Sequence, residues 1–528
     1  MLDGKNRIGF QISAEGNQTF KVFSPVKGEL LPQLFYSSTQ EELFNAISKA
    51  KQAQRVYRTK SNEEKAAFLR AIADEIDNRA EGIINTAALE SGLTRGRLTG
   101  ECMRTTNQLK LFAQVVEEGS WVEATIDPSD PNRAGTPKPD IRKMLVPLGL
   151  VGVFTASNFP LAFSTAGGDT ASALASGNAV IVKAHPYHAG TNELVANAIV
   201  EAVQKTGMPD GIFSSLNAVD FSIGQALVTH PDINAISFTG SFKGGKALYD
   251  LAQTRKDLIP VFTEMGSINP VVILPEQLEK LPSELAQTLA SSIVLGSGQF
   301  CTNPGFMVVM KGKGLDELKS KLKESIEACI PQLMLHPNIS IAYGEGLDKF
   351  NAFANFKTLA IAKAEPKENE SGAAVGYIAA KDFILKPALA EEVFGPFSLL
   401  VECDDRNEVL EVLGVLKGQL TTTVMGTDND VKTYQDIVDR LRDICGRVIF
   451  NGVPTGVEVG YAMHHGGPYP ATTDARFTSV GVDAVRRFAR PVAFQDAPDE
   501  YLPVELKNRN ERNIWRKING QLSRESVT

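Results

Sequence analysis

The stretch Gly149-Leu150-Val151-Gly152-Val153-Phe154 decides the fold of this 528-residue chain. It is a short, almost wholly apolar run, and similar runs recur after it with helical patterns between them. Apolar strands that alternate with helices are typical of a parallel sheet covered on both faces, so we predict an α/β fold. The expected strands cover 149–154, 179–183, 212–216, 235–238 and 271–274, and the expected helices cover 162–176, 191–206, 222–229 and 243–253.

Chemically distinctive residues follow three of these strands, namely Asn158, Lys183 and Gly240. Ligands of parallel sheets bind beyond the carboxyl ends of the strands, so we expect these residues to converge on one edge. Gly240 precedes a predicted helix, whose N-terminus would suit a pyrophosphate. Simpler interpretations stay open: an ordinary glycine-rich connection at Gly240, and a lysine that extends its amine to water at Lys183.

A second stretch, Gly296-Ser297-Gly298-Gln299-Phe300-Cys301, places a cysteine on a glycine-rich turn after a predicted helix. Glycines let the backbone approach a ligand closely. A thiol in such a turn has the exposure and the nearby backbone N–H that covalent catalysis requires. The alternative for a lone cysteine is a small buried hydrophobic residue.

The composition excludes several classes of protein. The length favours two or more domains, and 43% apolar with 22% charged residues is ordinary for a soluble protein. A net charge of -8 without a basic run argues against a nucleic-acid partner. Five widely spaced cysteines without CxxC indicate a reducing compartment and no zinc site, and no HExxH motif is present. Without an apolar leader or a long apolar run, we expect a cytoplasmic protein with no membrane partner.

The segments on either side of these strands and helices also show recognisable patterns. Capping-box patterns at 39–42 and 61–64 predict helix starts in an N-terminal helical layer. Residues 119–146 read as a long β-hairpin that must pack on something, because an isolated hairpin is marginal in water. A further helix is expected over 345–364, and residues 504–528 form a charged, turn-rich tail.

Six motifs, taken together, resemble the aldehyde dehydrogenase superfamily from about residue 20 to 495. They occur in the family's order and near its spacing, and they are Asn158-Phe159-Pro160, Lys183 after Val180-Ile181-Val182, Phe238-Thr239-Gly240-Ser241, Glu264-Met265-Gly266, Gly298-Gln299-Phe300-Cys301 and Glu392-Val393-Phe394-Gly395-Pro396.

The resemblance implies an aldehyde dehydrogenase-like α/β architecture in four parts. A Rossmann-type coenzyme-binding domain would take residues 1–118 and 147–262, and an α/β catalytic domain residues 263–480. Residues 119–146 and 481–503 would form a β-hairpin oligomerisation arm, followed by the tail at 504–528. The arm implies a homodimer or homotetramer.

The resemblance also implies the chemistry. Cys301 would attack the aldehyde carbon, and Asn158 with the Cys301 N–H would hold the oxyanion. Glu264 would activate water to release the acid from the thioester. A non-catalytic structural relative is the contrasting hypothesis, and it would be expected to lack the thiol or the base.

The coenzyme would be NADP or NAD, with no metal. The implied contacts are Lys183, His185, Pro186, Gly240, Ser241, Gly245, Glu392 and Phe394. In many relatives a glutamate stands three residues after the lysine, where it repels a 2′-phosphate. Here that position is Pro186, which slightly favours NADP.

The small-molecule aldehyde remains open between two substrate classes. The usual family ending near Pro-Phe-Gly-Gly is replaced by His464-His465-Gly466-Gly467-Pro468. This and related features resemble a branch that oxidises 2,5-dioxopentanoate to 2-oxoglutarate, with an NADP-dependent long-chain aldehyde dehydrogenase as the alternative. A keto acid needs a cation in its tunnel, whereas a fatty aldehyde needs apolar walls. The candidate substrate residues are Arg104, Phe159, Phe300 and Arg476, with an ordinary surface arginine as the alternative for Arg104 and for Arg476.

Overall fold

A computed structural model describes residues 2–527 of the chain, and it confirms the predicted α/β fold. Its first sheet has the order β13-β12-β9-β10-β11-β1-β2. The first five strands of this order, from β13 to β11, run parallel to one another. The strands are β1 (Asn6–Ile8), β2 (Gln11–Ser13), β9 (Leu150–Phe154), β10 (Ala179–Lys183), β11 (Phe213–Leu216), β12 (Ala235–Thr239) and β13 (Val261–Glu264).

Helices cover both faces of the first sheet, as the buried apolar strands require. They are α1 (Gln40–Tyr57), α2 (Asn62–Asn78), α3 (Ala80–Ser91), α4 (Arg95–Glu118), α5 (Gly168–Ala175), α6 (Ala189–Lys205), α7 (Ser222–Thr229) and α8 (Phe242–Gln253). Both predicted capping boxes are present, at Thr39 and Ser61. The helix expected from residue 162 begins only at Gly168, because the carboxylate of Glu101 takes up the N–H groups of Leu161 and Ala162 in a turn.

The second sheet has the order β17-β19-β20-β15-β14-β21-β22, and only β17 runs antiparallel. Its strands are β14 (Val271–Ile273), β15 (Phe306–Met310), β17 (Lys357–Ile361), β19 (Ala374–Ala379), β20 (Phe397–Cys403), β21 (Gln419–Met425) and β22 (Cys445–Phe450). Its helices are α9 (Pro275–Lys280), α10 (Pro282–Val294), α11 (Leu315–Glu327), α12 (Pro337–Asn351), α13 (Ala380–Ile384), α14 (Arg406–Val415), α15 (Asp428–Thr433) and α16 (Gln435–Asp443).

The helix expected over 345–364 is therefore wrong in its second half. α12 ends at Asn351, and residues 357–361 pair with β19 as an edge strand. Tertiary pairing decides this segment, because β-strand formation depends on neighbours more than on local sequence.

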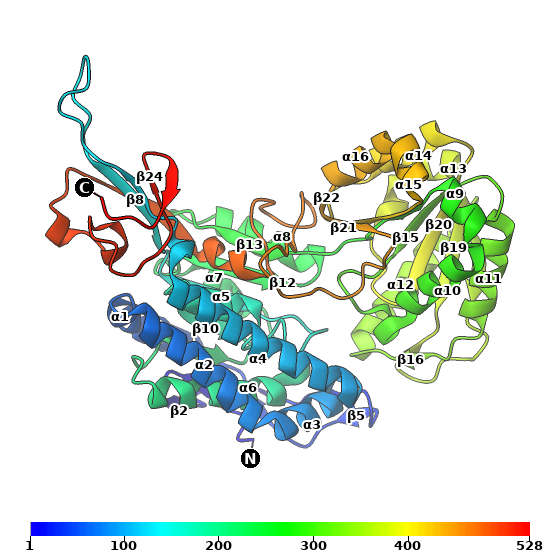
Figure 1. Cartoon of the computed structure of the whole chain (residues 1–528). Coiled ribbons are helices and arrows are strands. Elements are labelled where there is room, and N and C mark those ends of the chain that lie inside the picture. Colours follow the sequence, from blue (N-terminus) through cyan, green and yellow to red (C-terminus); the bar gives the residue numbers. More distant parts are fainter. Residues whose placement is uncertain (1, 528) are drawn as a thin grey trace.

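A third, five-stranded sheet, the arm sheet, has the order β23-β8-β7-β24-β25. It joins β7 (Thr125–Asp127) and β8 (Ile141–Pro147) to β23 (Ala489–Gln495) and to two strands of the tail, β24 (Arg516–Ile518) and β25 (Gln521–Ser523). Arg516, the first residue of β24, is 1% exposed and donates to the carbonyls of Lys507, Asn508 and Glu525, so it links β24 to other segments of the tail. Figure 1 shows the 128–140 hairpin tip projecting from the body.

Two long connections join the first and second sheets, which form separate α/β bodies in Figure 1. One runs from the end of β13 at Glu264 to the start of β14 at Val271. The other is the loop that returns from β22 towards residue 481. Both lie between the two bodies, where the predicted site residues meet. Within the described residues, no helix is both long and apolar enough to cross a membrane.

Candidate active site

The first sheet delivers four predicted site residues to a single edge. Phe154 pairs with Lys183 on one side and with Phe238 on the other, so β9, β10 and β12 end at the same level. Thr239 pairs with Glu264, which ends β13. The parallel register thus brings the residues after these strand ends together, as expected.

The turn before Cys301 is strained in a way that fixes the thiol. Gly296, Ser297 and Gly298 have φ values of 57°, 56° and 65°, the left-handed region that a serine rarely adopts. A Cβ on Gly298 would lie 2.2 Å from the carbonyl oxygen of Gly395, so only glycine allows this approach. Asn269 then holds the far side of the turn by donating its amide to the carbonyl of Cys301 at 2.9 Å.

Cys301, His465 and Glu264 form a compact cluster. The Sγ atom of Cys301 lies 3.7 Å from Nε2 of His465, and the same Nε2 lies 2.9 Å from Oε1 of Glu264. The Ser479 hydroxyl donates to the other carboxylate oxygen at 2.5 Å. The side chains of His465 and Glu264 are 0% and 3% exposed, whereas Cys301 is half-buried. A nucleophile and a base within reach of one another are the arrangement that covalent catalysis requires.

The surroundings shift the pKa values of the Cys301 thiol and the Glu264 carboxyl group in opposite directions. Burial raises the pKa of Cys301 well above its usual value, and the charges of Glu264 and Glu392 add to that effect. Burial also raises the pKa of Glu264, but charge and hydrogen bonds from His465, Ser479 and Cys301 together outweigh it, and the net shift is downward. At neutral pH the cluster therefore holds a protonated thiol beside an ionised carboxylate.

Asn158 lies beside the nucleophile. Its Nδ2 donates to the carbonyl of Gln299 at 3.1 Å, two residues before Cys301. A carboxamide carries two N–H donors, so the second remains for an oxyanion.

An aromatic wall borders the cluster. The rings of Phe159 and Phe300 meet edge to face with centroids 5.4 Å apart, and Phe163 contacts Phe159 at 5.2 Å. The guanidinium of Arg97 lies over both Phe159 and Phe300 and donates to the carbonyl of Asn158. The predicted substrate residues Phe159 and Phe300 are thus placed at the thiol.

Three of the residues expected at the coenzyme, Gly240, Ser241 and Gly245, lie at the start of α8 (Phe242–Gln253). Ser241 is the N-cap of α8, where its hydroxyl accepts from the N–H of Gly244, and Gly245 lies in the first turn. The N–H of Gly240 donates to the carbonyl of Glu264 at 3.0 Å, which ties this turn to the acidic residue. A helix N-terminus of this kind fits a pyrophosphate.

Glu392 and Phe394 line a pocket together with Gly298 and Phe300. A Cβ at Gly266 would lie 2.1 Å from a carboxylate oxygen of Glu392, so glycine at 266 is needed for that side chain to enter. The motifs at 264–266, 298–301 and 392–396 therefore meet in space, although they are far apart in the chain.

Lys183 and His185, two further residues expected at the coenzyme, lie at and just after the end of β10. Burial lowers the pKa of Lys183 to about 8, with Asp220 partly offsetting it. His185 accepts the N–H of Tyr187 at Nδ1, so a neutral ring presents Nε2–H as a donor. Pro186 begins the short 3₁₀ turn that follows, η2 (Pro186–His188), and it places no carboxylate there.

The aldehyde dehydrogenase family model matches residues 12–472 of the chain. The chain belongs to the aldehyde dehydrogenase family. It is 44% identical over 521 residues to alpha-ketoglutaric semialdehyde dehydrogenase 2 of Azospirillum brasilense, covering 98% of this chain and 99% of the relative. It is 40% identical over 524 residues to alpha-ketoglutaric semialdehyde dehydrogenase of Acinetobacter baylyi, covering 99% of both.

Solved structures share the aldehyde dehydrogenase fold. The NADP complex of NADP-dependent glyceraldehyde-3-phosphate dehydrogenase from Bacillus halodurans superposes with a TM-score of 0.78 at 21% identity, covering 94% of this chain and 99% of that one. Methylmalonate-semialdehyde dehydrogenase from Oceanimonas doudoroffii gives 0.79 at 18% identity, covering 94% and 98%.

The two arginines suggested for the substrate differ in position. The guanidinium of Arg104 lies over the ring of Phe163, within the aromatic wall of this aldehyde dehydrogenase. Arg476 does not join the site, because its side chain is 81% exposed and pairs with Asp474 at 2.6 Å.

Sequence reasoning missed His465, Asn269 and Phe163 as site residues of this aldehyde dehydrogenase. The departure from the family's usual ending marked the segment around His465 without giving it a role. Asn269 has a left-handed φ of 46°, a conformation that asparagine tolerates better than most residues, but only the fold shows that its amide reaches Cys301.

Proposed function

We propose that this aldehyde dehydrogenase oxidises 2,5-dioxopentanoate to 2-oxoglutarate with NADP or NAD, through a covalent intermediate on Cys301. The Cys301–His465–Glu264 cluster carries the proposal for the reaction. The semialdehyde relatives, which match over nearly their full length, support the substrate.

Glu264 acts first on the thiol. As a carboxylate it accepts the proton of Cys301, whose sulfur then adds to the aldehyde carbon to give a thiohemiacetal. The free N–H of Asn158 and the backbone N–H of Cys301 hold the developing oxyanion. His465 donates to Glu264 and keeps it ionised, so it is a positioning residue for the base.

Bound NADP or NAD would supply the hydride acceptor that conversion of the thiohemiacetal to a thioester requires. Gly240, Ser241 and Gly245 would hold the pyrophosphate, and Glu392 with Phe394 the nicotinamide end. Glu264, having released the first proton, takes a second one from water, and the hydroxide displaces the thiol and frees the carboxylic acid.

The preference for NADP or NAD depends on the residues expected at the adenosine ribose. We expect kcat/KM for NADP to equal or exceed that for NAD, because Pro186 offers no charge to repel a 2′-phosphate while Lys183 and His185 offer donors. Pro186→Glu should lower kcat/KM for NADP at least about tenfold relative to NAD, since like charges near a protein surface repel by several kcal/mol. Steady-state kinetics with both coenzymes measures this.

Pro186→Gln is the matched control, since it adds the same length without the charge. It should leave the NADP-to-NAD ratio near that of the wild type. A wild-type preference for NAD of a hundredfold would show that other residues set the selectivity.

The substrate is tested by kinetics on a panel of aldehydes with the wild-type enzyme. We expect kcat/KM for 2,5-dioxopentanoate to exceed that for pentanal and for decanal by about 100-fold, because a site built for polar groups rejects a ligand that leaves them unpaired. A preference for decanal would contradict the assignment.

A homo-oligomer is the remaining part of the proposal. β22 ends one side of the second sheet and β23 ends one side of the arm sheet, so each has an open edge. Open edges pair readily with strands of another chain, which supports a homodimer or homotetramer built through the arm. The absence of a membrane-crossing helix among residues 2–527 is compatible with the proposed cytoplasmic location.

A further inference from the structure

Three guanidinium groups near the active site, those of Arg97, Arg104 and Arg447, lack carboxylate partners within the described residues, and two of them face one loop. In the part of the chain that the structure describes, neither Arg104 nor Arg447 forms an ion pair. Both terminal nitrogens of Arg104 and Nε of Arg447 are shielded from solvent and have no hydrogen-bond partner. Burying an unpaired charge is costly, so such groups are expected to have a ligand in the working enzyme.

The two arginines come from different bodies and meet at one loop. Arg104 lies on α4 and its Nε donates to the carbonyl of Val457 at 3.4 Å. Arg447 lies on β22 and its Nη2 donates to the carbonyls of Pro454 and Gly456 at 3.2 and 3.3 Å. Because Gly456 and Val457 are consecutive, the guanidiniums converge on the same short segment, residues 454–457.

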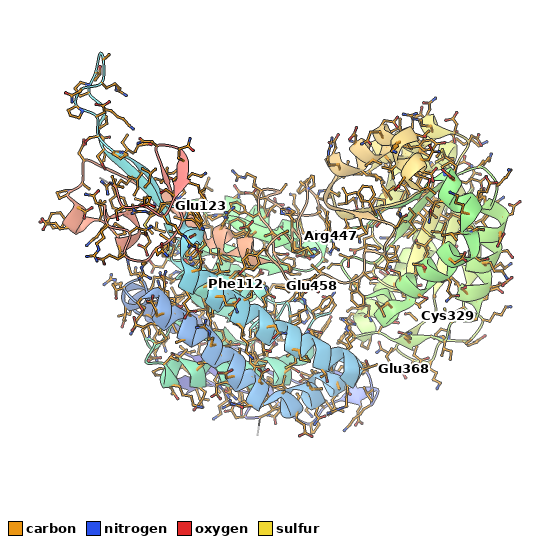
Figure 2. All side chains as sticks on the ribbon, in the orientation of Figure 1. Phe112, Glu123, Cys329, Glu368, Arg447 and Glu458 are labelled. Atoms are coloured by element: carbon orange, nitrogen blue, oxygen red, sulfur yellow. The ribbon has the colours of Figure 1, made fainter. Side chains whose placement is uncertain are left out.

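Arg104 lies next to the catalytic cluster, because its guanidinium lies 5.3 Å from the ring centre of Phe163, and that ring lies 6.4 Å from the ring of His465. Burial lowers the pKa of Arg104, and the charges that oppose the shift are those of Glu101, Cys301, Glu458 and Glu264. Burial likewise lowers the pKa of Arg447, opposed by Cys301 and Cys445. Figure 2 shows Arg447 and Glu458 in the region between the two α/β bodies.

The nearby carboxylates do not neutralise the pair directly. Glu101 accepts from the backbone N–H groups of Leu161 and Ala162, and the exposed Glu458 accepts from the N–H of Val459. The third local arginine, Arg97, also keeps one nitrogen, Nη1, without a partner, but its Nη2 donates to the Asn158 carbonyl and its guanidinium lies over the rings of Phe159 and Phe300, away from the 454–457 segment. Donors for one further anion therefore remain at Arg104 and Arg447.

We propose that Arg104 and Arg447 together bind the carboxylate of a 2-oxo-acid aldehyde, at the far end of the substrate from Cys301. This site rests on the proposed function and gives it a structural basis. The backbone carbonyls of residues 454–457 form only long hydrogen bonds to the guanidiniums. The substrate carboxylate makes stronger, charge-assisted hydrogen bonds to the free nitrogens. A long alkyl chain would leave both charges buried and unpaired, so the site discriminates against fatty aldehydes.

The test compares Arg104→Met and Arg447→Met with the wild type on 2,5-dioxopentanoate and on pentanal, which has the same chain length and no charge. Each variant should lose roughly 10- to 100-fold in kcat/KM for the keto acid, the range for a hydrogen bond to a charged group. Activity on pentanal should be retained or raised, which shows that the variant is folded. Arg442→Met, at an exposed arginine of α16, is the matched control and should change neither value.

Lysine variants sharpen the test. Arg104→Lys and Arg447→Lys keep the charge but lose the planar pair of donors, so they should recover only part of the lost activity. The dissociation constant of 2-oxoglutarate for the NADP-saturated enzyme, measured by calorimetry, should rise in the methionine variants without depending on turnover.

The outcomes separate the two proposals. If the wild type prefers the keto acid and both methionine variants keep that preference, the arginine site is wrong while the proposed function stands. If the wild type prefers pentanal, the proposed function fails and the arginine site fails with it. A collapse of the preference in the variants, with pentanal activity intact, supports both.

Discussion

Replacement of Cys301 by alanine is expected to abolish aldehyde oxidation, with a loss of about 10⁴-fold or more in kcat. The methyl group of alanine cannot form the covalent intermediate. A water molecule in the same place would not be oriented by the strained turn as the sulfur is. Coenzyme binding should persist, because the residues expected to hold it lie on β10, α8 and the 392–394 segment. Absorbance of the reduced coenzyme measures turnover, and calorimetry with NADP measures binding.

Cys445→Ala provides the control for the Cys301 variant. Cys445 is also half-buried, but it lies on β22 against the hydroxyl of Thr422 at 3.1 Å, outside the cluster. Its replacement should leave kcat within the range of ordinary packing changes. If the Cys301 variant kept most of the wild-type turnover, the assignment of the nucleophile would fail.

Replacement of His465 by alanine should reduce kcat/KM by about 10²- to 10⁴-fold, the usual contribution of general acid–base catalysis. The reason is indirect, since His465 supplies charge and a hydrogen bond that hold the pKa of Glu264 low against the effect of burial. Without them burial prevails, the pKa of Glu264 rises, and the carboxylate becomes protonated at higher pH. The acid limb of the pH–rate profile should therefore move towards alkaline pH.

Two variants separate this role from a purely structural one. His465→Gln can still donate to Glu264 and should recover part of the rate, with a smaller displacement of the acid limb. His464→Ala removes the adjacent, half-buried imidazole and should leave the profile in place. An unshifted acid limb in His465→Ala, whatever its rate, would show that His465 does not act through Glu264.

The sheet and the strand-end residues could be predicted because their signals are local. The apolar run 149–154 and its successors report a buried parallel strand directly, and glycine or asparagine after a strand reports a turn. The family motifs added Glu264 and Glu392, which no local pattern distinguishes from solvated charges. The fold then explains them, since Gly266 leaves just enough room for the Glu392 carboxylate.

The remaining features depend on packing between distant segments. His465 gains its place from hydrogen bonds to Thr478 and Ser479 and from the end of β13, and nothing in its own neighbourhood predicts that. Arg447 lies on an edge strand where an arginine would ordinarily face water. The predicted helix start at residue 162 failed for the same reason, because Glu101, far earlier in the chain, claims those backbone groups.

The arm sheet has a consequence for the order in which the protein is made. Thr125 pairs with Lys517, and Ile126 pairs with Ile518. The β7 edge therefore stays unpaired until β24 leaves the ribosome near the end of synthesis. Domains emerge and fold from the N-terminus onward, while contacts of such long sequence separation form late. A chain interrupted before residue 516 would already carry Cys301, His465 and both sheets, yet its β7 edge would stay open. The arm sheet can therefore be completed only after the residues of both bodies have been synthesised.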